Sequence, residues 1–320
     1  MSFRYRPETK RRAQWRWLAS GTALLVGLGS WGTARATVIR VDATADEDGS
    51  GSGCSLREAI KAANTDTAYG GCPAGSGDDF LYLFSTTSPA TFALTRTQSL
   101  AITGDMTLDG AGHIIKGGAS GGFDVKSGTV RFTSVRLTGF TNATPLIVRS
   151  VVSMDYSQIY SNKTTSVPQQ TFGIWVVAGG FLTATDSTLR DNAAIKGGGI
   201  YNNAGTVELT NVTIANNSSS QYGGGIMTVG GGYAELHNCT ISGNSATGYY
   251  GGGIYNGGNS FTMVYGSTIV NNTAQRQGGG IFDDASTYSG VAIRNTIVAN
   301  NVSRSGATFG GCSGTVYSYS

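Results

Sequence analysis

The feature that most constrains this chain is a repeat of about 27 residues that runs through its second half. In each copy an Ile or Leu is followed three positions later by Asn. A second motif, three glycines and an isoleucine, recurs between these copies, as in Gly197–Ile200 and Gly251–Ile254. One copy is too short to bury its own apolar face, so neighbouring copies must complete each other's core. The repeat therefore predicts a solenoid. Its Asn positions are Asn162, Asn192, Asn217, Asn244, Asn272 and Asn300.

Each position of the repeat has a physical role. The apolar residue is expected to form a column inside the coil, and Asn a ladder of side-chain amides along the axis. Asn also tolerates the left-handed backbone of a sharp corner, and glycine fits corners where a side chain would crowd the next coil. Alternation at Val207 and Leu209 indicates a third strand in each coil. We expect an all-β fold, a right-handed single-stranded parallel β-helix. A leucine-rich repeat would need a leucine spacing and a recurring helix that this chain lacks.

Residues 1–36 have the pattern of a secretory signal peptide. A basic region around Lys10–Arg12 precedes an uncharged apolar stretch, Leu18–Trp31, and Ala34–Ala36 fits the small-x-small cleavage pattern. The alternative is an uncleaved N-terminal anchor, although the stretch is short for a membrane span of about 20 residues. No second apolar segment follows, so we expect no transmembrane segment after signal removal and a secreted or cell-surface protein, extracellular or at a bacterial outer membrane.

The charge balance changes once this leader is set aside. Residues 1–36 carry seven of the 22 basic residues and one of the 19 acidic ones, so the rest of the chain is slightly acidic. A basic patch on the folded part, which nucleic-acid binding would need, is not indicated. Charged residues make up only 13% of the chain, which argues against disorder.

Residues 37–78 are predicted to form an N-terminal cap, and residues 79–320 the β-helix. Within the cap, Ser55 and Glu58 have the spacing of a capping box at a helix start, and Asn64 is a plausible stop. The apolar residues of this segment fall on one helical face. A solenoid must cover its first coil, so we expect a short amphipathic helix to serve as its lid.

The four cysteines divide into two groups. Cys54 and Cys72 bracket the predicted helix and are expected to form a disulfide in an exported protein, the alternative being two free thiols. Cys239 and Cys312 are separated by more than two coils, about 10 Å or more along the axis, which is beyond disulfide reach.

The segment Cys54–Ala59, with the sequence CSLREA, follows a signal peptide and a Val-rich strand. It resembles the CSLREA family of secreted bacterial proteins, and the repeats are similar to those of chlamydial-type polymorphic outer-membrane proteins. The resemblance implies a pectin-lyase-like superhelix, an exported or surface location, and in general no assigned reaction.

Carboxylates on neighbouring coils are the candidates for catalysis. Counting back from the apolar column places Asp155 and Asp186 in neighbouring positions on adjacent coils, close to Arg190 and Asp191. Such a group could share a Ca²⁺ ion or polarise a sugar carboxylate, as a polysaccharide lyase requires. The alternative is a surface ion-pair network of Arg190 with Lys163 and the acids. Outside the lyase hypothesis, we expect no cofactor.

The other polar residues give weaker evidence for a functional site. His113 and His237 lack the spacing of metal ligands, so no metal site is predicted. Asp283–Asp284 occupies the position that Asn202–Asn203 fills three coils earlier, which favours a role in the corner.

Two side-chain columns are expected on the outside of the coils. A hydrophobic residue follows each glycine–isoleucine corner, and these residues could form an aromatic stripe for sugar rings or for another protein. The alternative is ordinary cross-strand stacking. The second column consists of threonines, and regular threonine columns of this kind usually have a structural role. The stripe comprises Trp175, Tyr201, Met227, Tyr255 and Phe282, and the threonine column comprises Thr188, Thr213, Thr240, Thr268 and Thr296.

These patterns favour a noncatalytic exported protein that binds a polysaccharide or a surface protein. The alternative is a carbohydrate-active enzyme of the pectate-lyase-like class, a polysaccharide lyase or glycoside hydrolase acting on acidic polysaccharide. The fold is compatible with both, because fold alone does not determine function.

Overall fold

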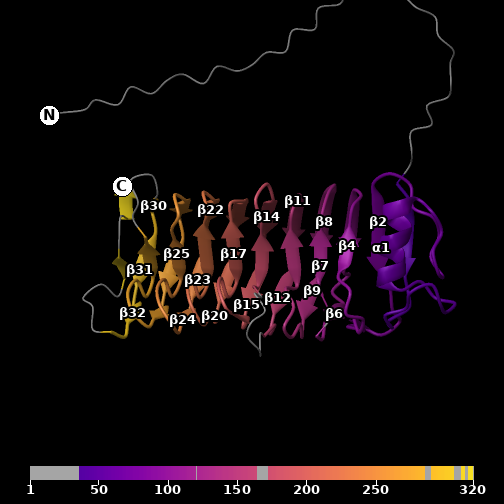
Figure 1. Ribbon diagram of the computed structural model, residues 1–320, viewed down its shortest axis with the longest axis horizontal. Helices are drawn as coiled ribbons and strands as arrows, with labels where there is room; N and C mark the ends of the chain where they lie inside the picture. The colour runs from indigo at the N-terminus through magenta and orange to yellow at the C-terminus, as the bar shows by residue number, and fades with distance from the viewer. Residues whose placement is uncertain are drawn as a thin grey trace, which may run out of the picture. The chain divides into compact units, whose positions relative to one another are not determined.

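The computed structural model describes residues 36–119, 121–163, 172–284, 290–305, 311–313 and 316–319. The predicted signal peptide lies outside them, except for its last residue. In the unit Ala34–Ser320 the chain winds into stacked coils, and each strand pairs in parallel with its equivalent in the next coil (Figure 1). The prediction of an all-β parallel solenoid is therefore confirmed.

Of the four sheets, sheet I has the longest run of paired strands among the described residues. Sheet I has 11 strands: β1 (Val38–Val41), β2 (Asp79–Leu83), β5 (Met106–Asp109), β8 (Thr129–Thr133), β11 (Val151–Asp155), β14 (Phe181–Thr185), β18 (Thr206–Thr210), β22 (Tyr233–His237), β26 (Phe261–Tyr265), β30 (Gly290–Arg294) and β34 (Val316–Tyr319). Sheet II has nine: β4 (Leu100–Ile102), β7 (Phe123–Val125), β10 (Leu146–Val148), β13 (Ile174–Val176), β17 (Ile200–Asn203), β21 (Ile226–Val229), β25 (Ile254–Asn256), β29 (Ile281–Asp283) and β33 (Cys312–Ser313).

The other two sheets flank the asparagine turn. Sheet III has nine described strands: β3 (Thr91–Ala93), β6 (Ile114–Lys116), β9 (Arg136–Thr138), β12 (Gln158–Tyr160), β15 (Thr188–Arg190), β19 (Thr213–Ala215), β23 (Thr240–Ser242), β27 (Thr268–Val270) and β31 (Ile297–Ala299). Sheet IV has five: β16 (Ala193–Ala194), β20 (Ser218–Ser219), β24 (Ser245–Ala246), β28 (Thr273–Ala274) and β32 (Val302–Ser303). The later coils thus have a fourth short strand, where the sequence predicted about three.

The asparagine ladder is buried between sheets III and IV. In each step an Asn side chain donates from Nδ2 to the Oδ1 of the next ladder Asn, as Asn192 does to Asn217 at 2.9 Å. The same Nδ2 also donates to a backbone carbonyl of the preceding coil, which for Asn192 is that of Ile159, at 2.9 Å. The ladder satisfies polar groups that burial would otherwise leave unpaired. The left-handed residue of the corner is the one before the ladder Asn, such as Asp191 with φ 57°, so that part of the expectation was wrong.

The last rung of the ladder differs from the prediction. Asn301, not Asn300, accepts the hydrogen bonds from Asn272, at 2.9 Å from its backbone nitrogen and 3.0 Å from Nδ2. Asn300 takes the left-handed corner position instead, with φ 54°. The register explains the shift, because Ile269 pairs with Val298 and Ile297 is left 61% exposed.

The same shift alters the threonine column. Thr268 pairs with Ile297, so Thr296 does not continue the column. The Thr296 hydroxyl occupies the turn after sheet I, where it accepts a hydrogen bond from the backbone nitrogen of Ser267 at 3.4 Å.

The glycine corners are required by close approach between coils. A Cβ on Gly198 would lie 2.3 Å from the carbonyl oxygen of Gly224 in the next coil. Gly197 has φ +55°, a left-handed conformation that glycine adopts without steric cost. The chain therefore turns into sheet II with no room for a side chain, and the isoleucines that follow, such as Ile200 and Ile226, are fully buried.

Helix α1 (Leu56–Thr65) covers the first coil (Figure 1). Ser55 is its N-cap, and its side chain and that of Glu58 form the predicted capping box. Leu56 and Ile60 are buried against the core, as a lid requires. The predicted disulfide between Cys54 and Cys72 is present, whereas Cys239 and Cys312 are free.

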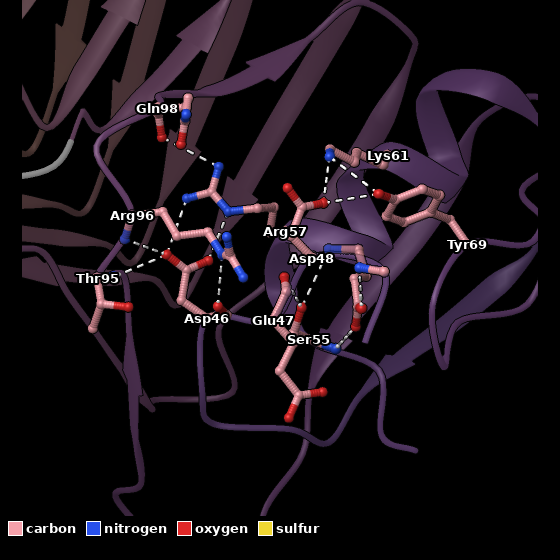
Figure 2. Close-up of polar contacts among 12 residues, drawn as sticks. Asp46, Glu47, Asp48, Ser55, Arg57, Lys61, Tyr69, Thr95, Arg96 and Gln98 are labelled. Carbon is pink, nitrogen blue, oxygen red and sulfur yellow. Dashed lines mark hydrogen bonds and ion pairs between the residues drawn. The ribbon is translucent and has the colours of Figure 1, made fainter. Parts of the chain in front are cut away.

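A polar network ties the cap to the coil beneath it (Figure 2). Arg57 donates from Nε and Nη2 to the two carboxylate oxygens of Asp46, at 2.7 and 3.0 Å, and both side chains are buried. Asp46 also accepts from the backbone nitrogens of Thr95 and Arg96 at 2.9 and 2.8 Å. Burial alone would raise the pKa of Asp46, but Arg57 and the backbone donors outweigh it and hold the pKa below its usual value. Lys61 forms an ion pair with Asp48 on the same side.

This network gives each polar residue of the CSLREA segment a structural role. Glu58 accepts from the backbone nitrogens of Ser55 and Gly49 at 3.1 and 2.8 Å, while the Ser55 hydroxyl donates to the carbonyl of Glu47 at 3.0 Å. Together with the disulfide and the Arg57–Asp46 pair, these bonds fasten the loop before α1 to the solenoid. The segment is a clamp for the lid.

Candidate functional site

The structure separates the four predicted catalytic residues into three local pairs. Asp155 pairs in register with Thr185, so Asp186 lies one position further along, in the left-handed corner with φ 48°. Asp155 lies four residues before Ile159 of the apolar column, whereas Asp186 lies three residues before Leu189. Asp155 forms an ion pair with Arg131 at 2.9 Å, whereas the Asp186 carboxylate accepts from Asn211 at 2.9 Å.

Arg190 and Asp191 form the third pair. Their side chains meet at 2.6 Å, and the Arg190 guanidinium lies 4.7 Å from the centroid of the Tyr160 ring. Within the described residues, no group of three or more His, Cys, Asp and Glu side chains is placed to hold a metal ion. A catalytic role for the four residues stays a prediction.

The two histidines lie apart. His113 is buried and its Nδ1 accepts from the backbone nitrogen of Ala90 at 3.0 Å. His237 is on the outer face of sheet I, where its Nε2 is 2.7 Å from a carboxylate oxygen of Glu235. Asp283 is buried in register with Asn256, whose Nδ2 donates to it at 2.7 Å, which fits the predicted corner role.

The hydrophobic column predicted on sheet II exists, but most of it is covered. Trp175, Tyr201, Met227, Tyr255 and Phe282 are consecutive partners in β13, β17, β21, β25 and β29. We call this column the inner stripe. Tyr201 is only 8% exposed and Tyr255 only 7%, so the expectation that they offer rings to a ligand was wrong. Burial raises the pKa of Tyr201 and, together with the nearby Asp284 carboxylate, that of Tyr255.

A second aromatic layer covers the inner stripe. Phe172 stacks on Tyr201 with centroids 4.4 Å apart, and Tyr222 lies tilted against Tyr255 with centroids 4.9 Å apart. Tyr250 stacks on Phe282 at 4.3 Å. Offset and tilted aromatic pairs of this kind each contribute about 1 kcal/mol beyond area burial. This outer layer comprises Phe172, Tyr222, Tyr249 and Tyr250.

The sequence carried a signal for this layer that the prediction did not use. Phe172, Tyr222 and Tyr250 each stand directly before the first described glycine of a corner. The segment before a tight turn reads as a loop, and loops are expected to be polar, so aromatic residues there are informative. Five rings remain partly exposed and form what we call the aromatic surface: Trp175, Tyr222, Tyr249, Tyr250 and Phe282.

Two cations lie against the aromatic surface: Arg149, whose guanidinium is 5.7 Å from the Trp175 centroid and which is paired with Asp124, and Arg276. The Arg276 guanidinium lies 4.9 Å from the Tyr249 centroid and 5.8 Å from that of Tyr250. Its Nη1 donates to the Tyr250 hydroxyl at 3.4 Å. Asp284 accepts from the Tyr255 hydroxyl at 3.2 Å. The surface thus combines apolar rings, hydroxyl groups and a charged donor, the chemistry with which proteins bind sugars and anions.

A cleft borders the aromatic surface at Trp175. It has a volume of about 480 Å³, and its lining includes Thr97, Ser99, Thr144 and Ile147 besides Trp175. The outward residues of β4 and β10 here are small or aliphatic, so no aromatic layer fills the space. The cleft adds hydroxyl groups next to an indole ring on the same sheet.

Of three comparisons with known proteins, the one with solved structures gives a match. No family model matches it, so membership of the CSLREA family stays a prediction. No curated protein matches it either. Among solved structures it is similar to pectate lyase Pel9A, with a TM-score of 0.58 and 14% sequence identity over 90% of this chain and 80% of that one. At this identity the likeness concerns the fold alone, and it places the chain among the parallel β-helices.

Proposed function

We propose that the chain is an exported, noncatalytic protein that binds glycans through the aromatic surface. The observation that carries this proposal is the second aromatic layer. Cross-strand stacking within the inner stripe accounts for stability of the sheet, but it does not require partly exposed tyrosines above it. A cluster of exposed rings with a polar rim is typical of an interaction site.

Two further observations support the location and the partner class. The Cys54–Cys72 disulfide suits an oxidising compartment, as expected after export. No helix among the described residues is long and apolar enough to cross a bilayer. The similarity to a pectate lyase supports a polysaccharide as the partner in preference to a surface protein.

The proposal is tested with the purified chain on a panel of neutral and acidic glycans. Removing two exposed rings with Tyr222→Ala and Tyr250→Ala is expected to weaken binding by on the order of tenfold or more. Tyr249→Ala is a second variant with less effect on packing, because the ring contacts described for Tyr249 are with Tyr222 and Tyr250 of the outer layer and not with the inner stripe. The matched control is Tyr156→Ala, since Tyr156 is a 66% exposed tyrosine elsewhere on the solenoid. Equal binding by all variants would contradict the proposal.

A polysaccharide lyase is the second candidate, favoured by the fold similarity to pectate lyase Pel9A. Incubation with uronate polymers, with and without Ca²⁺, tests it directly. New unsaturated products that disappear in an Asp155→Asn variant would support this reading. If neither unsaturated products nor reducing ends form under any condition, the lyase hypothesis is refuted.

A further inference from the structure

Two columns of side chains run along the axis over the turn from sheet IV to sheet II. Backbone hydrogen bonds define the first, because the nitrogens of Gly197, Gly223 and Gly251 donate to the carbonyls that precede the next glycine corner, at 3.0, 3.1 and 3.2 Å. The second consists of residues that are linked directly by backbone hydrogen bonds, because each nitrogen donates to the carbonyl of the residue one coil earlier, at 3.0, 3.0 and 2.9 Å. The first column contains Lys196, Tyr222, Tyr250 and Gln277, and the second contains Ile195, Gln221, Tyr249 and Arg276.

This register places a cation at each end of the tyrosines. Lys196 begins one column and Arg276 ends the other, three coil steps apart. Coils stack at about 4.8 Å, so the two positive groups are separated by roughly 14 Å along the axis. Tyr222, Tyr249 and Tyr250 lie between them. The arrangement is a strip that follows the coil axis, with aromatic residues in the middle and positive charge at both ends.

Arg276 is prepared for an anion. Its guanidinium is held over two tyrosine rings and its side chain is exposed. Within the described residues no carboxylate pairs with it, whereas Arg57, Arg131, Arg149 and Arg190 each have an acidic partner. Stacking uses the face of the guanidinium and leaves N–H donors at its edge, in the geometry that binds carboxylate or sulfate in a bidentate manner.

Asp284 lies beside the inner stripe, and its carboxylate accepts a hydrogen bond from the Tyr255 hydroxyl. The strip therefore has an excess of positive charge on a chain that is otherwise slightly acidic once residues 1–36 are set aside. An extended polymer with a regular series of negative groups is complementary to this spacing. A neutral glycan would leave the cations without partners.

Resting on the proposed glycan-binding function, we infer that the ligand is an anionic glycan that lies along the coil axis, with carboxylate or sulfate groups at Arg276 and Lys196 and sugar rings on the tyrosines. Uronate polymers and sulfated glycans share this chemistry. Binding of a polyuronate and of a sulfated glycosaminoglycan, each compared with a neutral polysaccharide of similar length, distinguishes the two sources.

The test measures affinity for the three probes with Arg276→Gln, which keeps a long polar side chain and removes the charge. Binding of the anionic probe is expected to weaken by on the order of tenfold, the size of a lost charge-assisted hydrogen bond. Arg276→Lys is expected to restore only part of it, because Lys lacks the planar fork. Lys196→Gln is expected to weaken binding less, since among the residues that the structure describes no ring is stacked on that cation. Raised salt should weaken wild-type binding.

The matched control is Arg40→Gln. Arg40 is also exposed and stacked on a ring, with its guanidinium 3.6 Å from the Phe84 centroid, but it lies on β1 at the other end of the solenoid. Anionic binding that is lost in Arg276→Gln and kept in Arg40→Gln supports the inference. Equal binding of neutral and anionic probes, unchanged in Arg276→Gln, overturns the inference and leaves the proposed function standing. No binding of any glycan overturns both.

Discussion

Removing Asp46 from the cap should unfasten the lid from the solenoid. Asp46→Ala leaves the Arg57 guanidinium without its partner in a site where the two side chains are 0% and 5% exposed. Loss of one member of a buried ion pair costs about 3–5 kcal/mol, because the other charge stays buried and unpaired. The backbone donors of Thr95 and Arg96 lie at the surface, where water replaces the lost carboxylate, so they add little. We expect the free energy of unfolding of the cap to fall by about 3 kcal/mol or more.

The effect should be local, because each coil of a solenoid touches only its neighbours. Native-state hydrogen exchange is the suitable assay, since it reports the opening of separate segments. Amides of α1 and β1 should exchange faster in Asp46→Ala, while amides of β22 and β26, far along the axis, should be unchanged.

The double variant Asp46→Ala with Arg57→Ala is the control for the electrostatic reasoning. It removes the stranded charge, so it should be less destabilised than the sum of the two single variants, with a coupling of about 1–3 kcal/mol. Purely additive effects, or a cost of Asp46→Ala within 0.5 kcal/mol of zero, the range of an ordinary surface substitution, would refute the account.

Three further predictions concern other buried groups. Asn244→Ala interrupts the ladder, leaves the Asn217 amide and backbone donors unpaired, and should cost on the order of 3 kcal/mol in urea unfolding; a cost like that of a surface change would contradict it. Burial raises the pKa of Asp79, so the folded state keeps this proton to a higher pH than the unfolded chain does. The free energy of unfolding should therefore fall as pH rises from about 4 through the folded-state pKa. Asp79→Asn should remove this pH dependence, and a pH profile unchanged by the substitution would argue against it. Reducing the Cys54–Cys72 disulfide, with a sequence separation of 18, should lower cap stability by about 3 kcal/mol, and a thermal transition unaffected by reductant would exclude that.

The fold could be predicted from the sequence because each position of the repeat has a residue type that its place in the coil requires. The column Ile214, Ile241 and Ile269 and the Asn three positions after each were identifiable from periodicity alone. The prediction failed in the last coil because apolar residues and asparagines occur there in adjacent pairs. Either Ile297 or Val298 could have continued the column, and only the strand pairing selects Val298.

The candidate site was less predictable for a different reason. The inner stripe was found, since it follows the glycine corner at constant spacing. Its burial was not, because aromatic residues before a glycine corner show that the corner is unusual but not that Tyr222 and Tyr250 pack over the stripe. For the acids, the spacing placed Asp155 and Asp186 in neighbouring positions but could not show that one lies in a strand and the other in a corner, where each has its own partner.

The glycine corners divide the chain into positions that cannot vary and positions that can. A Cβ at Gly198 or Gly224 would strike the backbone of the next coil, at 2.3 and 2.4 Å. The position just before each corner has no such restriction, because the same backbone holds a lysine, two tyrosines and a glutamine in successive coils. Under the proposed function, substitutions at these positions are therefore expected to change ligand preference one coil at a time, with the residues inside the coils left unchanged. The solenoid can therefore present different outward side chains along its axis while the glycine corners that hold the coils together stay the same.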